Sequence, residues 1–176
     1  MKICLTGYMG SGKTTIGKAL SLKTHVPFID LDEYIEIKEK QSIPEIFKNR
    51  GEIYFRKIEN QYLKELLTRE SLILSTGGGT PIFYNSMDSI NASMVSFYLQ
   101  NSPAGLAERL MKEKSKRPLI QHLKDEELTE FIAKHLFERN QFYRQSHYII
   151  ATQEKSIENL VEEILMKFKA HHQNPS

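Results

Sequence analysis

The segment from Gly7 to Thr14 has the residue types and spacing of a phosphate-binding loop. It matches the pattern G-x-x-x-x-G-K-[ST], directly after an apolar run and directly before a helical stretch. Glycines let the backbone turn so that amide hydrogens point at phosphate oxygens, Lys13 can reach the β- and γ-phosphates, and the Thr14 hydroxyl can ligate Mg²⁺. A glycine-rich turn without a ligand is the alternative, but eight residues and both flanking elements agree with a nucleoside triphosphate site. The residues expected to bind its phosphates are Gly10, Ser11, Gly12, Lys13, Thr14 and Thr15.

Two carboxylates stand at the end of the second apolar run, Val26–Asp30. Asp30 and Asp32 follow Phe28 and Ile29, and open α/β sheets bind ligands at the carboxyl ends of their strands. One carboxylate could hold the water shell of Mg²⁺ and the other could accept a proton from an attacking hydroxyl. The alternative is that Asp32 caps the next helix, a common use of aspartate. The sequence supports both interpretations of Asp32 equally.

Three consecutive glycines, Gly77, Gly78 and Gly79, follow the apolar run Leu72–Ser75. Adjacent glycines cost conformational entropy and make most sense where a ligand approaches the backbone closely. A turn without function would also accommodate them, but their place directly after a strand favours a binding site.

Three arginines stand out by their context: Arg56, Arg117 and Arg139. A guanidinium group suits bidentate recognition of carboxylate and phosphate, so three converging arginines would mark an anionic substrate. Taken singly, each arginine is better explained as a solvated helix residue. The sequence does not show whether they converge.

The composition fits one globular domain of balanced charge. The chain has 176 residues, 40% of them hydrophobic, and its formal net charge of +2 does not imply a nucleic-acid partner. The single cysteine, Cys4, excludes an intrachain disulfide and a cysteine-based zinc site. The N-terminus lacks the pattern of a signal peptide, and no apolar run is long enough to span a bilayer. We expect a cytoplasmic monomer with a single domain over residues 1–176 that binds neither nucleic acid nor membrane.

The elements that must position these residues alternate as in an α/β protein. Five apolar runs are separated by segments of helical spacing, at Lys2–Thr6, Val26–Asp30, Leu72–Ser75, Met94–Leu99 and Tyr148–Ala151. This alternation predicts βαβ units and a five-stranded parallel sheet flanked by helices in a three-layer sandwich.

Helix ends carry their own signals. Ser42 and Glu45 form a capping box, and Ser102 and Ser156 are further N-cap candidates. One apolar stripe predicts a closing helix packed on the sheet, and it consists of Leu160, Val161, Ile164, Leu165 and Phe168.

Two segments depart from the alternation. Residues 112–125 are rich in lysine and interrupted by Arg117-Pro118. Too little chain follows for a second domain, so the segment is not an interdomain linker, and we predict a mobile lid. Residues 170–176 are polar, and we expect them to be frayed.

Taken together, the chain resembles shikimate kinases, small P-loop kinases with the nucleoside monophosphate kinase architecture. The resemblance runs from Lys2 to about Ala151 and rests on GYMGSGKT, DLD, GEIYFRKIE, STGGGT, KRPLI and ERNQFY in this order. The P-loop alone occurs in very many proteins, whereas the ordered combination is specific. It implies that ATP phosphorylates the 3-hydroxyl of shikimate, giving 3-phosphoshikimate and ADP on the route to chorismate and the aromatic amino acids.

The resemblance also implies roles for individual residues. Asp32 would bind the substrate hydroxyls and serve as base, while Arg56, Arg139 and the glycines 77–79 would hold the substrate. Arg117 would arrive on the closing lid to meet phosphate and substrate charge, so that Lys13, Asp32 and Arg117 form the catalytic set. Asp30 would assist Thr14 in binding Mg²⁺.

The chain departs from the family pattern near the expected adenine site. Family members usually have an arginine seven residues before the lid arginine; here that position is Leu110, and Arg109 comes one residue too early. The residues that contact adenine are therefore unassigned, with 151–154 as a candidate border. Two other functions stay open: a kinase of the same architecture for gluconate or a nucleoside monophosphate, and a non-catalytic regulatory P-loop protein.

Overall fold

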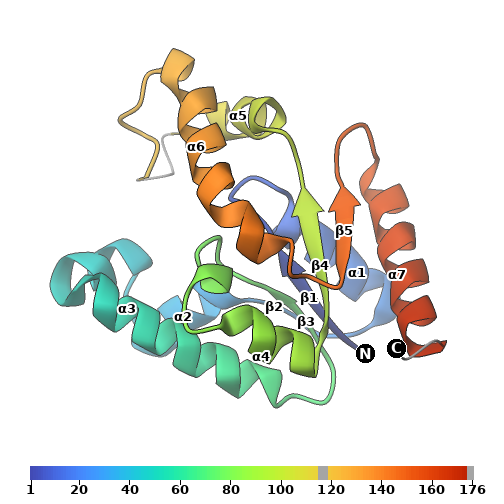
Figure 1. Ribbon diagram of the computed structural model, residues 1–176. Coiled ribbons are helices and arrows are strands. Elements are labelled where there is room, and N and C mark those ends of the chain that lie inside the picture. The colour runs from blue at the N-terminus through green and yellow to red at the C-terminus, as the bar shows by residue number, and fades with distance from the viewer. Residues whose placement is uncertain (115–118, 174–176) are drawn as a thin grey trace.

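The computed structural model describes residues 1–114 and 119–173, and within these ranges the chain forms an α/β fold (Figure 1). Its sheet has five strands: β1 (Lys2–Thr6), β2 (Phe28–Asp30), β3 (Leu72–Ser75), β4 (Val95–Gln100) and β5 (Tyr148–Ala151). Their order is β2-β3-β1-β4-β5, and every neighbouring pair is parallel. The predicted five-stranded parallel sheet is confirmed. Two boundaries differ, since β2 begins after Pro27 and β4 is shifted by one residue.

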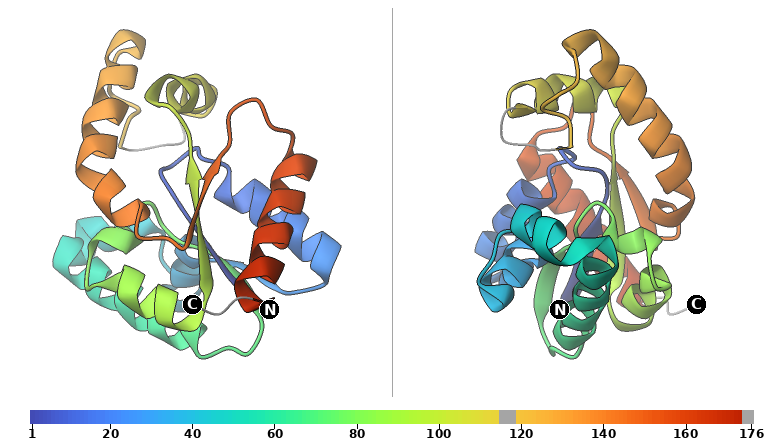
Figure 2. Two further views of the ribbon diagram at one scale, coloured as in Figure 1. Left: turned by 45° about the vertical axis from the view of Figure 1, so that its right-hand side comes forward. Right: turned by 90° about the vertical axis from the view of Figure 1, so that its left-hand side faces the viewer.

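Seven α-helices are described besides the short 3₁₀ helix η1 (Thr80–Ile82): α1 (Lys13–Thr24), α2 (Leu31–Glu39), α3 (Ile43–Leu67), α4 (Ser86–Ser93), α5 (Pro103–Met111), α6 (Asp125–Tyr143) and α7 (Ile157–Gln173). Figure 2 shows α1 and α7 on one face of the sheet and α3, α4 and α6 on the other. The predicted three-layer sandwich is confirmed.

Alternate residues of β1 pack into two different hydrophobic cores, one on each face of the sheet. Ile3 and Leu5 pack with the apolar residues of α1 and α7, whereas Cys4 between them packs with α2, α3 and α4. This alternation follows from the two-residue period of a strand whose faces are both covered by helices. A third cluster lies under α5 and α6 and contains Tyr8 and Tyr98.

The helix signals in the sequence are confirmed. The Ser42 amide donates to Glu45 Oε2 at 2.8 Å, which is half of the capping box that starts α3. Ser102 Oγ accepts from the Gly105 amide, and Ser156 Oγ accepts from the Asn159 amide. In α7 the predicted stripe faces the core, with Leu165 only partly buried. Helix α3 also bends at Gly51, whose φ of 77° lies in the left-handed region.

The lid and tail predictions are only partly within the described residues. Residues 119–124 lead into α6, with Ile120 buried, and Lys114 pairs with Asp125 at 2.6 Å. Residues 115–118, which include Arg117, lie outside the described ranges, as do residues 174–176. Residues 170–173, which we expected to be frayed, continue α7 as helix because the rings of His171 and His172 pack on Tyr148 and Phe168.

No helix within residues 1–114 and 119–173 is long and apolar enough to cross a membrane.

Candidate active site

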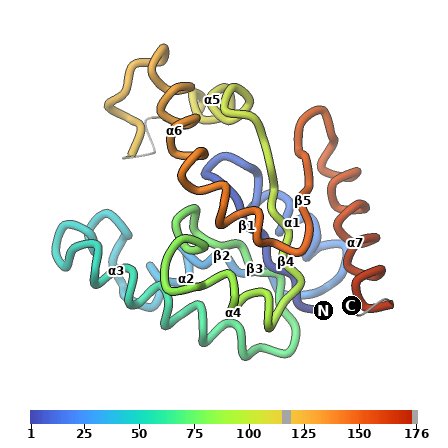
Figure 3. Tube along the Cα trace, in the orientation of Figure 1, coloured from blue at the N-terminus to red at the C-terminus, as the bar shows by residue number. Residues whose placement is uncertain are grey.

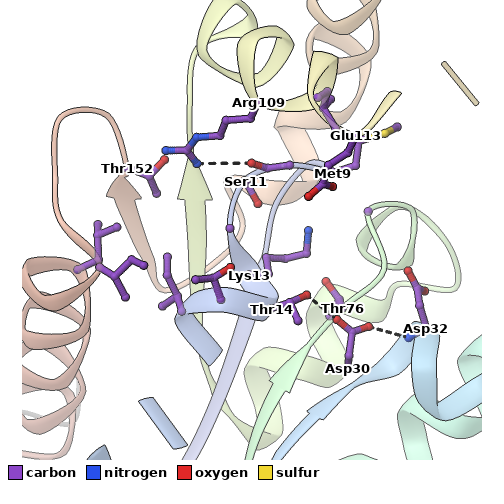
Figure 4. A pocket seen from close by; sticks show the side chains of 18 of the residues that line it. Met9, Ser11, Lys13, Thr14, Asp30, Asp32, Thr76, Arg109, Glu113 and Thr152 are labelled. Carbon is purple, nitrogen blue, oxygen red and sulfur yellow. Dashed lines mark hydrogen bonds between the residues drawn. The ribbon is translucent and has the colours of Figure 1, made fainter. Parts of the chain in front are cut away.

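The carboxyl ends of β1, β2 and β3 meet at one edge of the sheet, and each leads into a loop or helix end with polar groups (Figure 3). There they border a cavity of about 570 Å³. Figure 4 shows the side chains that line it. The complete lining is Met9, Gly10, Ser11, Gly12, Lys13, Thr14, Thr15, Ile16, Asp30, Asp32, Thr76, Gly78, Arg109, Leu110, Lys112, Glu113, Thr152, Lys155, Ile157 and Leu160. The phosphate loop, both aspartates and one of the three glycines thus share one cavity.

The loop after β1 has the backbone that its glycines predict. Gly7, Gly10 and Gly12 have φ values of 139°, 77° and 95°, which residues with a side chain rarely adopt. Gly12 is the N-cap of α1, so the amino end of that helix opens on the cavity. The Lys13 ammonium donates to the carbonyls of Gly7 at 2.8 Å and Tyr8 at 3.0 Å. The loop therefore concentrates amide hydrogens and one cation at the same place.

Asp30 connects the phosphate loop to α2. Its Oδ2 atom accepts a hydrogen bond from Thr14 Oγ1 at 2.9 Å, and its Oδ1 atom accepts one from the Asp32 amide at 3.1 Å. Asp30 is therefore the N-cap of α2. The alternative that Asp32 caps this helix is wrong, because α2 begins at Leu31, two residues earlier than a cap at Asp32 requires, and Asp32 lies inside the first turn. The Asp32 side chain points into the cavity instead (Figure 4).

The Asp32 carboxyl has a pKa near neutral pH. Burial raises its pKa to about 7, and the negative charges of Asp30 and Glu59 add to this effect. Lys13 and Arg56 act in the opposite direction without cancelling it. A group of this pKa can take up and release a proton at physiological pH, as a general base must.

The three glycines after β3 allow two side chains to approach their backbone. A β-carbon on Gly77 would lie 2.6 Å from Asp32 Oδ1, and one on Gly79 would lie 2.8 Å from Arg56 Nη1. Contacts this short do not occur for real side chains, so a side chain at position 77 must displace Asp32 or the loop, whereas one at position 79 must displace the end of the flexible Arg56 side chain. Gly78 has more room and lines the cavity itself.

Arg56 is held by the carboxylate of Glu59, which was not predicted from the sequence. Its Nη1 atom donates to Glu59 Oε2 at 2.8 Å, and its guanidinium lies over the ring of Phe83 at 4.3 Å. Glu59 is buried and also accepts from Thr80 Oγ1 at 2.7 Å. The available signal was the spacing of Arg56 and Glu59, which puts them on one face of a helix.

Arg139 comes to the same region from α6. Its guanidinium lies 5.7 Å from the ring centre of Tyr8, and one turn later the Tyr143 hydroxyl donates to the Gly78 carbonyl at 2.6 Å. Neither Arg56 nor Arg139 lines the cavity, but each belongs to an element in contact with the glycine loop. The expected convergence with Arg117 stays a prediction, since that residue lies outside the described ranges.

Arg109 places a positive charge at the end of the cavity away from Asp32, where relatives were expected to have an arginine at the position of Leu110. Arg109 Nη1 lies 3.4 Å from the Gly10 carbonyl, whereas Leu110 is buried and packs against Gly10. Thr152, within the segment 151–154 that we named as a candidate border, lines this end together with Lys155. Lys155 was not predicted, because a lone lysine just before a helix carries no distinguishing signal.

Comparisons with known proteins identify one family for this chain. The family model described as shikimate kinase matches residues 9–169. A shikimate kinase of Flavobacterium psychrophilum is 46% identical over 165 residues, which cover 93% of this chain and 96% of that relative.

Two solved structures show the same fold in proteins of related sequence. Shikimate kinase from Bacteroides thetaiotaomicron has a TM-score of 0.90 at 42% identity, covering 95% of this chain and 97% of the other. Shikimate kinase from Acinetobacter baumannii in complex with shikimate has a TM-score of 0.87 at 32% identity, covering 96% and 93%. The order of the motifs, the strand order and these similarities lead to one conclusion: the chain belongs to the shikimate kinase family.

Proposed function

We propose that this protein transfers the γ-phosphoryl group of ATP to the 3-hydroxyl of shikimate, giving 3-phosphoshikimate and ADP. The observation that carries the proposal is the position of Asp32. Its carboxylate lies against the glycine loop at Gly77 and lines the same cavity as Lys13 and Thr14. A proton acceptor thus stands between a triphosphate site and a loop able to receive a second ligand.

ATP binds with its phosphates on the loop after β1. The amides of residues 10–15 and the positive end of α1 receive the phosphate oxygens, and Lys13 neutralises the charge that develops on the transferring group. We assign the nucleoside to the end of the cavity lined by Arg109, Thr152 and Lys155.

The oxygens of Thr14 and Asp30 fit a magnesium ion. A hydroxyl and a carboxylate lie 2.9 Å apart at the floor of the cavity, and hard oxygen donors of this kind suit Mg²⁺. When bound there with ATP, the ion would neutralise part of the phosphate charge.

Shikimate binds on the other side of Asp32. The carboxylate of shikimate pairs with Arg56 and Arg139, since two guanidiniums from different helices suit bidentate recognition of a carboxylate. Amides of the glycine loop bind the same ligand, and Asp32 accepts a hydrogen bond from the 3-hydroxyl. This places the acceptor oxygen toward the γ-phosphate.

In the chemical step, the 3-hydroxyl oxygen forms a bond to the γ-phosphorus while the bond from that phosphorus to the β–γ bridging oxygen breaks. The hydroxyl proton passes to Asp32, and ADP leaves with the bridging oxygen. The predicted contribution of Arg117 is additional charge neutralisation on the same group.

A coupled assay with ATP, Mg²⁺ and shikimate tests the proposal, with gluconate and AMP as competing acceptors and mass spectrometry of the product. We expect turnover with shikimate and little with the other two. The variant Lys13→Ala should lose roughly a hundredfold or more in turnover, whereas Lys18→Ala, an exposed lysine on the same helix, should keep it.

The competing functions give other results. Preferred turnover of gluconate or AMP would assign the chain to another acceptor. Absence of turnover with every acceptor, combined with tight nucleotide binding, would support a regulatory P-loop protein.

A further inference from the structure

Tyr8 belongs to the phosphate loop, yet its side chain does not line the cavity. Its carbonyl accepts hydrogen bonds from the Lys13 ammonium at 3.0 Å and from the Ser11 amide at 3.2 Å. Its side chain is only 1% exposed and turns into the core under α5 and α6. One residue thus connects the phosphate-binding backbone to the core under α5 and α6.

The other end of this connection is α6. The Tyr8 hydroxyl lies 3.1 Å from His135 Nδ1, and the Arg139 guanidinium lies over the Tyr8 ring at 5.7 Å. His135, Arg139 and Tyr143 are spaced four residues apart and therefore share one face of the helix. At the end of that face, the Tyr143 hydroxyl binds the Gly78 carbonyl. This row of side chains leads from the phosphate loop to the glycine loop.

We propose that Tyr8 is a positioning residue that couples the two substrate sites, because its hydrogen bond to His135 holds Arg139 in register with the phosphate loop. The proposal rests on the proposed function in one respect, the assignment of the shikimate carboxylate to Arg139. When phosphates fix the loop backbone, Tyr8 is fixed with it, and α6 then presents Arg139 in one place. Shikimate binds more tightly as a result, and by linkage it tightens nucleotide binding by the same factor.

Tyr98 offers a matched control. Its hydroxyl donates to Asn140 Oδ1 at 2.7 Å, and its ring stacks on Tyr143 at 5.1 Å. Like Tyr8 it is buried and hydrogen-bonded to α6, but it belongs to β4 and not to the phosphate loop. A general need to anchor α6 would make the two tyrosines equivalent, whereas coupling through the loop would not.

The test is calorimetric measurement of the shikimate dissociation constant of the full chain with and without saturating ADP. We expect the wild-type ratio of these constants to be at least fivefold, toward the lower end of the roughly 5- to 150-fold range of coupled sites. In Tyr8→Phe the ratio should fall below about twofold while shikimate binding without nucleotide stays close to wild type. In Tyr98→Phe the ratio should stay as in the wild type.

The partner of the bond provides a second variant. His135→Leu should reduce the ratio as Tyr8→Phe does, and the double variant should show no further loss, because both changes break the same bond. If Tyr8→Phe proves too unstable to purify, His135→Leu alone tests the bond.

The proposal is overturned by a wild-type ratio near one, by an unchanged ratio in either single variant, or by an equal loss in Tyr98→Phe. Failure of the proposed function would look different, since wild-type protein would then neither bind nor phosphorylate shikimate.

Discussion

Asp32 and Gly77 approach each other so closely that a β-carbon on Gly77 would lie 2.6 Å from Asp32 Oδ1. The carboxylate of a short side chain has little room to yield, so alanine at position 77 must displace either the base or the loop. Because misplacement by about 1 Å can cost a factor of about 100 in rate, we expect Gly77→Ala to lower kcat/KM by at least that factor. Steady-state kinetics on a variant with a wild-type circular dichroism spectrum checks this.

Gly78→Ala is the comparison for this steric argument. A β-carbon there would lie 3.6 Å from the nearest atom, the Met9 amide nitrogen, which is an ordinary contact. The loss in kcat/KM caused by Gly78→Ala should therefore be smaller than the loss caused by Gly77→Ala. Equal losses in the two variants would mean that crowding at Asp32 is not the cause.

The pH dependence of the reaction should report Asp32. A base must be ionised to accept a proton, and burial raises the pKa of this carboxyl to about 7. We therefore expect kcat/KM to rise with pH through about 7 and to level off above it. Asp32→Asn should lose this dependence together with roughly a hundredfold or more of the rate, while ADP binding by calorimetry stays near wild type.

The same shift makes a prediction about stability. The Asp32 pKa is raised above its ordinary value of 3.8, so the folded state holds this proton more tightly than the unfolded state. The contribution of the group to stability is complete below pH 3.8 and is lost as the pH rises through about 7. Asn carries no charge at any pH, and Asp32→Asn should raise Tm by a few degrees at pH 8. A smaller gain is expected at pH 5, and a variant that melts earlier at both values would refute the buried-charge account.

Glu59 should affect both Arg56 and Asp32. Glu59→Gln removes the charge that pairs with Arg56 at 2.8 Å and one of the charges that raise the Asp32 pKa. We expect a higher KM for shikimate and a shift of the pH profile of kcat/KM to lower pH. Glu52→Gln is the matched control, because Glu52 pairs with the same arginine at 3.4 Å but its side chain is 60% exposed. An unshifted profile in Glu59→Gln would argue against electrostatic coupling of the two carboxylates.

His147 should make the fold sensitive to acid at the other end of the sheet. Its Nδ1 atom accepts a hydrogen bond from the Ser96 amide at 3.2 Å and therefore carries no proton. Burial and the nearby His171 lower the pKa of His147 below its ordinary value of 6.5. The contribution of the neutral ring to stability is complete above pH 6.5 and is lost as the pH falls below it.

We expect His147→Asn to flatten the decline in Tm between pH 7 and pH 5, because Asn offers an uncharged acceptor in a similar position. His25→Asn, at an exposed histidine, should keep the wild-type decline. If the two variants decline equally, His147 is not the group responsible.

Features encoded in neighbouring residues were determined by the sequence alone. The five strands follow from short apolar runs, and the phosphate loop follows from glycines whose left-handed φ values only that residue adopts readily. The helix starts at Ser42, Ser102 and Ser156 were also predictable from local sequence, because a cap is a contact between residues three apart. The parallel order of strands and helices then brings Asp30, Asp32 and the glycine loop to one edge of the sheet.

Tertiary packing determined the surroundings of these residues: which one caps α2, which one is buried and which side chains they contact. The sequence could not distinguish a proton acceptor from a helix cap at Asp32, because the answer depends on where β2 ends and α2 begins. The raised pKa of Asp32 depends on burial and on Glu59, and the bond from Tyr8 to His135 joins residues 127 positions apart. Desolvation and long-range contacts have no local signature in a chain, since they are set by which surfaces the packed helices bring together.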